Sequence, residues 1–166
     1  MLRHLLKLSR QVEVSRFPSF LCDLRPLPMP STEAPLTAAS IIPEIGSDPV
    51  AAVRAGLPYE AVEHVQKPLE APDELLARAM GISTRTLSRR REAGTLTTGE
   101  SDRLVMLAEI VALARQALGS MKAAREWLSA PHSMLGGESP LDHTDTIAGM
   151  EEIKSMLYHI EYSLPA

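Results

Sequence analysis

Arginines and short hydroxyl side chains gather in one stretch of the chain: Ser83, Thr84, Arg85, Ser88, Arg89, Arg90 and Arg91. Helical spacing places Thr84, Arg85, Ser88 and Arg89 on the outward face of one helix. Arginine can bond bidentately to guanine in the major groove, and serine and threonine can bond to phosphate oxygens or base edges. The cluster therefore predicts DNA binding, and the alternative is a solvated arginine-rich face on an ordinary helical hairpin.

The residues around this cluster predict a helix, a tight turn and a second helix. Apolar residues at helical spacing mark the first helix: Leu75, Leu76, Ala79 and Met80. Gly81 breaks it, Ser83 is a suitable N-cap for a second helix through about Ala93, and Gly94 suits a left-handed stop. The spacing of Ala77, Gly81 and Leu87 is typical of a helix-turn-helix, because small residues let the helices cross closely while the leucine fills the corner.

Charge is divided unevenly along the 166 residues, although the net charge is only −4. Residues 83–93 hold four arginines and one glutamate, a local charge of +3, whereas residues 131–166 hold one lysine and six acidic residues, a local charge of −5. This division predicts two different partners. Cys22 is the single cysteine, and the sequence has neither a signal-peptide pattern nor an apolar run of membrane-spanning length. We expect a cytoplasmic protein without a membrane partner.

Three regions are expected from composition and periodicity. Residues 1–47 form an N-terminal arm and linker, in which residues 1–25 are either a short amphipathic helix or a poorly ordered leader. The prolines that follow exclude a long helix: Pro26, Pro28, Pro30, Pro35, Pro43 and Pro49. Residues 48–120 form the helix-turn-helix domain with a long core helix, and residues 121–166 form a C-terminal domain.

The remaining pattern predicts an all-α fold. Asp48 caps a short helix that Gly56 ends, and Pro68 ends or kinks the next one. Thr97 and Glu100 form a capping box for a helix over about 98–118 that is apolar on two sides, so it is the core of the fold or the seam of a homodimer. A final helix, capped by Asp142 or Thr144, runs to about Tyr162.

Catalysis, a metal site and a cofactor are not expected. His132, His143 and His159 do not have the spacing of a known ligand set, and no nucleophile elbow or phosphate-binding glycine loop is present. Trp127 is interpreted as a core anchor. A small helical hydrolase and a localisation protein that docks through its last helix are the alternatives from other classes.

From Trp127 onward, the chain resembles the C-terminal toxin-binding domain of Xre/MbcA/ParS antitoxins. The resemblance lies in these residues: Trp127-Leu128, Pro131, Leu135-Gly136-Gly137, Ser139-Pro140-Leu141-Asp142, Thr146, Gly149, Leu157 and Ile160-Glu161-Tyr162. Residues 56–59 and 81–91 also resemble that family's Xre-like helix-turn-helix. The match covers about residues 48–164. It departs from the family at Ser163, where glycine is common, at His132, where asparagine is common, and at Pro68, which interrupts a usually unbroken helix.

The resemblance implies an antitoxin that occludes the active site of an NAD-degrading RES-domain toxin and represses its own promoter. It implies a homodimer that forms a hetero-oligomer with the toxin. The implied toxin contacts are Leu135, Gly136, Gly137, Glu138, Ser139, Glu161, Tyr162, Ser163 and Leu164. An acidic loop and terminal helix would suit an electropositive site for an anionic dinucleotide. A stand-alone repressor without a toxin is the alternative.

Overall fold

The computed structural model describes residues 36–163, of which the side chain of Ser163 is not described. Within this range the chain forms α-helices and two short 3-10 helices, η2 and η3. Their order is α1 (Ala38–Ile41), η2 (Pro43–Ile45), α2 (Pro49–Ala55), α3 (Glu60–Leu69), α4 (Asp73–Ala79), α5 (Thr84–Ala93), α6 (Thr98–Leu118), α7 (Met121–Ser129), η3 (Ser133–Leu135), α8 (Pro140–His143) and α9 (Ile147–Ser163). The predicted all-α fold is confirmed. The predictions for residues 1–35 and for Leu164 lie outside the described residues.

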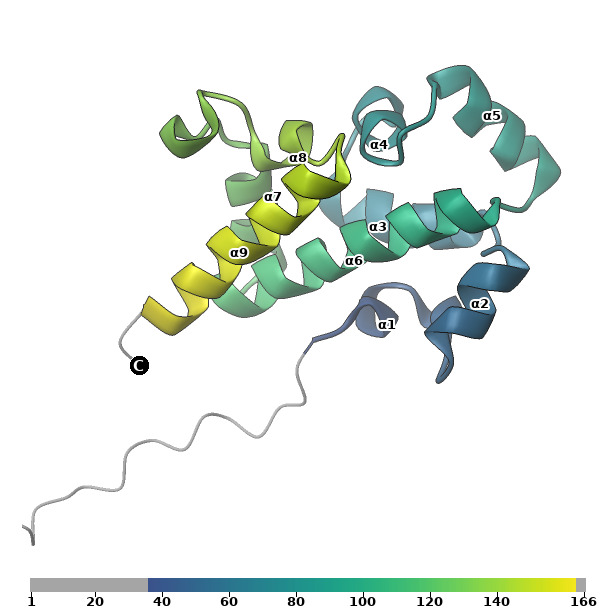
Figure 1. Cartoon of the computed structure of the whole chain (residues 1–166), viewed down its shortest axis with the longest axis horizontal. Coiled ribbons are helices and arrows are strands. Elements are labelled where there is room, and N and C mark those ends of the chain that lie inside the picture. Colours follow the sequence, from purple (N-terminus) through teal and green to yellow (C-terminus); the bar gives the residue numbers. More distant parts are fainter. Residues whose placement is uncertain (1–35, 164–166) are drawn as a thin grey trace, which may run out of the picture. The chain divides into compact units, whose positions relative to one another are not determined.

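Helix α6 is the element on which the others pack. Most of its apolar side chains are buried, with Leu104, Ile110 and Val111 fully inaccessible to solvent, whereas Met106 and Leu113 are partly buried. Helices α1, α2, α3, α7 and α9 all contact it, and Figure 1 shows α9 and α3 lying along its length. Because these contacts come from the same chain, the prediction that α6 belongs to the core is confirmed.

The predicted start and end signals of the early helices are present. The Asp48 carboxylate accepts a bond from the Ala51 N–H at 3.0 Å and so caps α2, which ends before Gly56. Helix α3 stops directly after Pro68 and Leu69, where Glu70 takes a left-handed conformation. The capping box of α6 is complete, because the Thr97 hydroxyl accepts from the Glu100 N–H while the Glu100 carboxylate accepts from the Thr97 N–H.

The end of the proline-rich segment is not a linker. Prolines do keep its helices short, as expected, but α1 and η2 pack into the core through Ala38, Ile42 and Ile45. Helix α1 lies against α6. The linker predicted through residue 47 is therefore wrong from Ala38 onward, because apolar side chains between the prolines are used to cover α6.

The cap predicted for the last helix is also wrong. The separate short helix α8 comes first, and the Ser139 hydroxyl caps it by accepting from the Asp142 N–H at 3.2 Å. Thr144 is buried and donates its hydroxyl to Leu141 O at 2.7 Å, so it closes α8. The hydroxyl that starts α9 belongs to Thr146, which accepts from the Gly149 N–H at 3.0 Å.

The described residues form one compact unit, in which α6 belongs to the core of both predicted domains. A division near residue 120 coincides with Gly119, where α6 ends in a left-handed turn, and it stays a prediction. Among the described helices, none alone is long and apolar enough to cross a membrane. Helices α6 and α7 reach that length and composition only as a pair, bent by 115° between them.

Two helical glycines give a matched test of the packing between α8 and α9. A Cβ on Gly149 would overlap the backbone carbonyl oxygen of His143, whereas a Cβ on Gly99 would meet no atom within 4 Å. We expect Gly149→Ala to lower the free energy of unfolding by about 1–3 kcal/mol, because backbone must move to relieve the overlap. Gly99→Ala should raise it by up to about 1 kcal/mol, since alanine favours helix. Chemical denaturation measures both, and equal effects would contradict the proposed packing.

Candidate nucleic-acid and partner interfaces

The turn between α4 and α5 has the tight geometry predicted for a helix-turn-helix. Ala77, Met80 and Leu87 are buried at the corner, and the Ile82 N–H donates to Ala77 O at 2.9 Å. Gly81 has a φ of 68°, in the left-handed region that favours glycine. Small side chains and a left-handed residue thus let the two helices cross closely.

The Arg103 side chain of α6 holds this turn in place through hydrogen bonds. Its Nη1 donates to Ala79 O at 3.3 Å, at the end of α4, and to Asp145 O at 3.0 Å, between α8 and α9. A Cβ on Gly81 would meet the same guanidinium group within 3 Å. One side chain therefore bonds both the helix-turn-helix and the C-terminal region to the central helix.

The outer face of α5 matches the predicted DNA-contacting face. Ser83, Thr84, Arg85, Ser88 and Arg89 are all exposed. Ser83 also caps the helix, since its hydroxyl accepts from the Thr86 N–H at 3.1 Å. Among the described residues, neither Arg85 nor Arg89 has an ion-pair partner, so both guanidinium groups are presented to solvent.

Arg90 points the other way and holds α5 to the start of α6. Its Nε lies 3.0 and 2.7 Å from the two Glu100 carboxylate oxygens, and its side chain is only 22% exposed. Burial by itself would raise the pKa of Glu100. The Thr97 backbone N–H and the Arg90 guanidinium outweigh it and hold that pKa below its usual value. This partly buried pair joins α5 to α6 and directs the Arg90 guanidinium toward Glu100.

Arg91 is also bound within the chain. Its Nε donates to the Tyr59 hydroxyl at 3.0 Å, and its guanidinium carbon lies 5.3 Å from the centre of the Tyr59 ring, a cation–π contact. Its Nη2 lies 3.1 Å from Asp73 Oδ2. The Gln66 amide and then Arg91 hold the pKa of Asp73 below its usual value, against the effect of burial. Helical spacing had already separated Arg85 and Arg89, on the outward face, from these two arginines, but it did not give the partners of Arg90 and Arg91.

The predicted partner-binding loop lies between α7 and α8. The His132 N–H donates to Glu138 O and the Gly137 N–H donates to His132 O, both at 2.9 Å, so the loop is closed at its base. The His132 ring also packs on Trp127, with 4.9 Å between ring centres, and its Nε2 donates to Trp127 O at 3.1 Å. Trp127 is half-buried, so it supports the loop as well as the core.

The predicted toxin-contacting residues of this loop are partly exposed and partly buried. Gly136, Gly137 and Glu138 are exposed, whereas Leu135 is buried and Ser139 is the buried cap of α8. These two residues stay predicted members of the site, but their side chains shape the loop instead of facing outward. The sequence analysis did not single out Met134, which is 78% exposed in the same loop, because spacing along the chain does not show which apolar residue faces solvent.

His143 connects this loop to the last helix. Its Nδ1 lies 3.1 Å from a Glu138 carboxylate oxygen, and its Nε2 lies 3.1 Å from one of Glu152 on α9. A neutral imidazole has one N–H, so only the imidazolium can donate to both carboxylates. Hydrogen bonds to Glu138 and Glu152 raise the pKa of His143 above its usual value.

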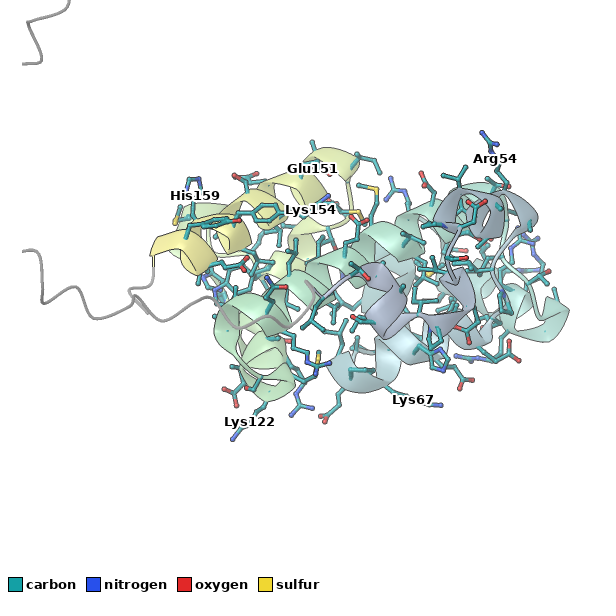
Figure 2. The ribbon with its side chains drawn as sticks, turned by 90° about the horizontal axis from the view of Figure 1, so that it is seen from below. Arg54, Lys67, Lys122, Glu151, Lys154 and His159 are labelled. Carbon is teal, nitrogen blue, oxygen red and sulfur yellow. The ribbon has the colours of Figure 1, made fainter. Side chains whose placement is uncertain are left out.

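The end of α9 carries the remaining predicted contacts. Tyr162 is 82% exposed, while Glu161 is partly buried and accepts a hydrogen bond from the Gln116 amide of α6. Lys154 on the same helix pairs with Glu109 and Glu151, each at 3.2 Å, and Figure 2 shows Lys154 and Glu151 together on α9. Ser163 is the last residue of the helix. No cluster of metal-ligating side chains occurs in residues 36–163.

Two known family models match the described part of the chain. The family described as the antitoxin Xre-like helix-turn-helix domain matches residues 48–109, and the antitoxin Xre/MbcA/ParS C-terminal toxin-binding domain matches residues 113–162. The chain belongs to the Xre-type antitoxins. Antitoxins with these two domains bind DNA and a toxin and are not enzymes, so the predicted absence of catalysis is confirmed.

Two curated relatives carry the same description. The chain is 26% identical to an antitoxin Xre from Yersinia enterocolitica over 141 residues, which covers 84% of this chain and 95% of that protein. It is 38% identical to an antitoxin Xre from Pseudomonas putida over 80 residues, covering 48% of this chain and 50% of that protein. The first similarity extends over both domains of the antitoxin.

The His143 bridge predicts a pH dependence of stability. Since the pKa is raised in the folded state, the contribution is fully present below the unfolded pKa of about 6.5 and is lost as pH rises through the folded value. We expect the His143 bridge to contribute less than about 1 kcal/mol to the free energy of unfolding, because the two carboxylates are exposed. His143→Gln should remove this loss above pH 6.5 in urea denaturation. The control His159→Gln, on an exposed residue of α9, should retain it (Figure 2).

Proposed function

We propose that the partner of this antitoxin is a RES-domain toxin that degrades NAD, and that the antitoxin occludes its active site. We also propose that the antitoxin represses its own operon as a homodimer, alone or in a hetero-oligomer with the toxin. The observation that carries the proposal is the presence of two separately exposed surfaces on one unit, α5 and the C-terminal region. The resemblance of residues 48–164 to the family supports the identity of the toxin.

The arrangement of α5 supports specific recognition of operator DNA. Arg85 and Arg89 lie one turn apart on its exposed face, next to the hydroxyls of Thr84 and Ser88. This combination supplies both bidentate base contacts and phosphate contacts. A dimer would place two such helices on successive major grooves, as helix-turn-helix repressors do.

The charge of the C-terminal surface supports occlusion of a nucleotide site. Glu138 extends from the loop and Glu151 and Glu152 from α9, and all three side chains are exposed. A site that binds the phosphates of a dinucleotide is electropositive, so an acidic surface complements it. Tyr162 adds an exposed aromatic side chain at the end of the same helix, a residue type enriched in interfaces.

Removing the two outward arginines tests the DNA surface. We expect Arg85→Ala and Arg89→Ala each to cost about 1–3 kcal/mol of specific binding to the DNA upstream of the antitoxin gene, as for a lost base contact. Fluorescence anisotropy at fixed salt measures the affinity. Unfolding free energy should stay unchanged, because neither side chain has an ion-pair partner among the described residues.

Lys122→Ala is the matched control for this experiment. It removes one exposed positive charge from α7, and Figure 2 shows Lys122 extending away from the ribbon. We expect operator affinity to stay near that of the wild-type chain. An unchanged affinity in the Arg85→Ala/Arg89→Ala double variant would contradict the assignment of α5 as the DNA-reading helix.

Co-expression with the product of the adjacent gene tests the toxin partner. Expression of that product alone should deplete cellular NAD and stop growth, and the full antitoxin chain should restore both. Tyr162→Ala should weaken the rescue without unfolding the chain, since this side chain is exposed. Absence of any toxicity would contradict the RES assignment and leave a DNA-binding regulator with another partner for its C-terminal domain.

A further inference from the structure

Met134 is a large apolar side chain that the fold leaves outside. It is 78% exposed, whereas the next residue, Leu135, is 6% exposed and packs in the core cluster. The two neighbours in η3 thus have opposite roles. Leu135 attaches the loop to the protein, and Met134 gains little burial from the folded chain.

The loop that carries Met134 is held in one conformation. Besides the closure between His132 and Glu138, the Leu135 N–H donates to His132 O at 3.0 Å, and the Gly136 N–H donates to Ser133 O at 3.3 Å. The His132 ring on Trp127 and the buried Leu135 fix the loop from the inside. These contacts order the loop that carries the Met134 side chain. An ordered loop loses less conformational entropy when a partner binds.

Gly136 and Gly137, in the same loop as Met134, have open space where a side chain would stand. Gly136 and Gly137 have φ values of 67° and 93°, and a Cβ on either one would meet no atom within 4 Å. Their lack of side chains is therefore required by backbone conformation and not by packing within the chain. Another protein can approach the backbone closely here, two and three residues after Met134.

We propose that Met134 is an apolar anchor of the toxin interface and inserts into an apolar pocket on the toxin. The proposal rests on the toxin-binding function proposed above, and the match of residues 113–162 to a toxin-binding domain assigns the occupant. Methionine is enriched in protein interfaces, where its flexible, polarisable side chain fills irregular pockets. Glu138, exposed at the end of the same loop, provides the polar edge of this contact.

Three substitutions in the full chain test the anchor, with the purified product of the adjacent gene as the probe. Met134→Gln keeps the length of the side chain but makes it polar, and we expect it to weaken toxin binding about tenfold or more. Met134→Leu keeps the apolar volume and should stay within about threefold of wild type. Val50→Gln is the control, because Val50 is 57% exposed on α2, outside the toxin-binding domain, and should leave the affinity unchanged.

The outcomes separate the anchor from the proposed function. Toxin binding by the wild-type chain, with equal affinity for Met134→Gln, would overturn the anchor alone. Absence of binding by the wild-type chain would overturn the toxin partner and the anchor together. Operator affinity should be the same for all three variants, which shows that the effect does not come from misfolding.

Oxidative footprinting gives a second test, because a purely structural role of Met134 would not make its oxidation rate depend on the toxin. In the free chain, dilute peroxide should convert the Met134 thioether to the sulfoxide faster than the buried Met80 and Met150, as measured by peptide mass spectrometry. Bound toxin should slow oxidation of Met134 at least severalfold, whereas bound operator DNA should not. Equal oxidation of Met134 with and without the toxin would overturn the proposal.

Discussion

Burial of α6 within its own chain is the constraint on which the structure depends. Its two apolar stripes face in different directions, so helices on more than one side must cover it. Segments far apart in the sequence meet this need, from α1 near residue 40 to α9 at the end of the described chain (Figure 1). Aromatic residues make up only 4% of the chain, so leucine, isoleucine, valine and alanine fill the core along this helix.

Charged residues in the first two turns of α6 also position the neighbouring helices. Glu100 holds α5 through Arg90, and Arg103 holds the end of α4 together with the turn before α9. A direct ion pair between Arg78 of α4 and Asp142 of α8, at 2.8 Å, adds a further connection. The helix-turn-helix and the C-terminal region are thus supported by the same framework, while their exposed residues lie on different elements.

Local signals in the sequence predicted much of this architecture correctly. The cap at Asp48, the capping box of Thr97 and Glu100, and the stops at Gly56 and Gly94 all depend on residues within one helical turn, so they can be identified without a fold. The cap of the last helix was predicted wrongly because several nearby residues can each cap a helix. Asp142, Thr144 and Thr146 are all suitable caps, and only the packing of α8 against α9 selects Thr146.

The sequence by itself determined the helical class, the helix-turn-helix and the family, because periodicity, caps and motif spacing are properties of neighbouring residues. Only the tertiary structure showed that Arg90 and Arg91 are paired within the chain, since their partners come from α6, α4 and Tyr59. It also decided that Leu135 faces the core while Met134 faces solvent. Burial depends on which distant surface a side chain meets, and spacing along the chain does not contain that information.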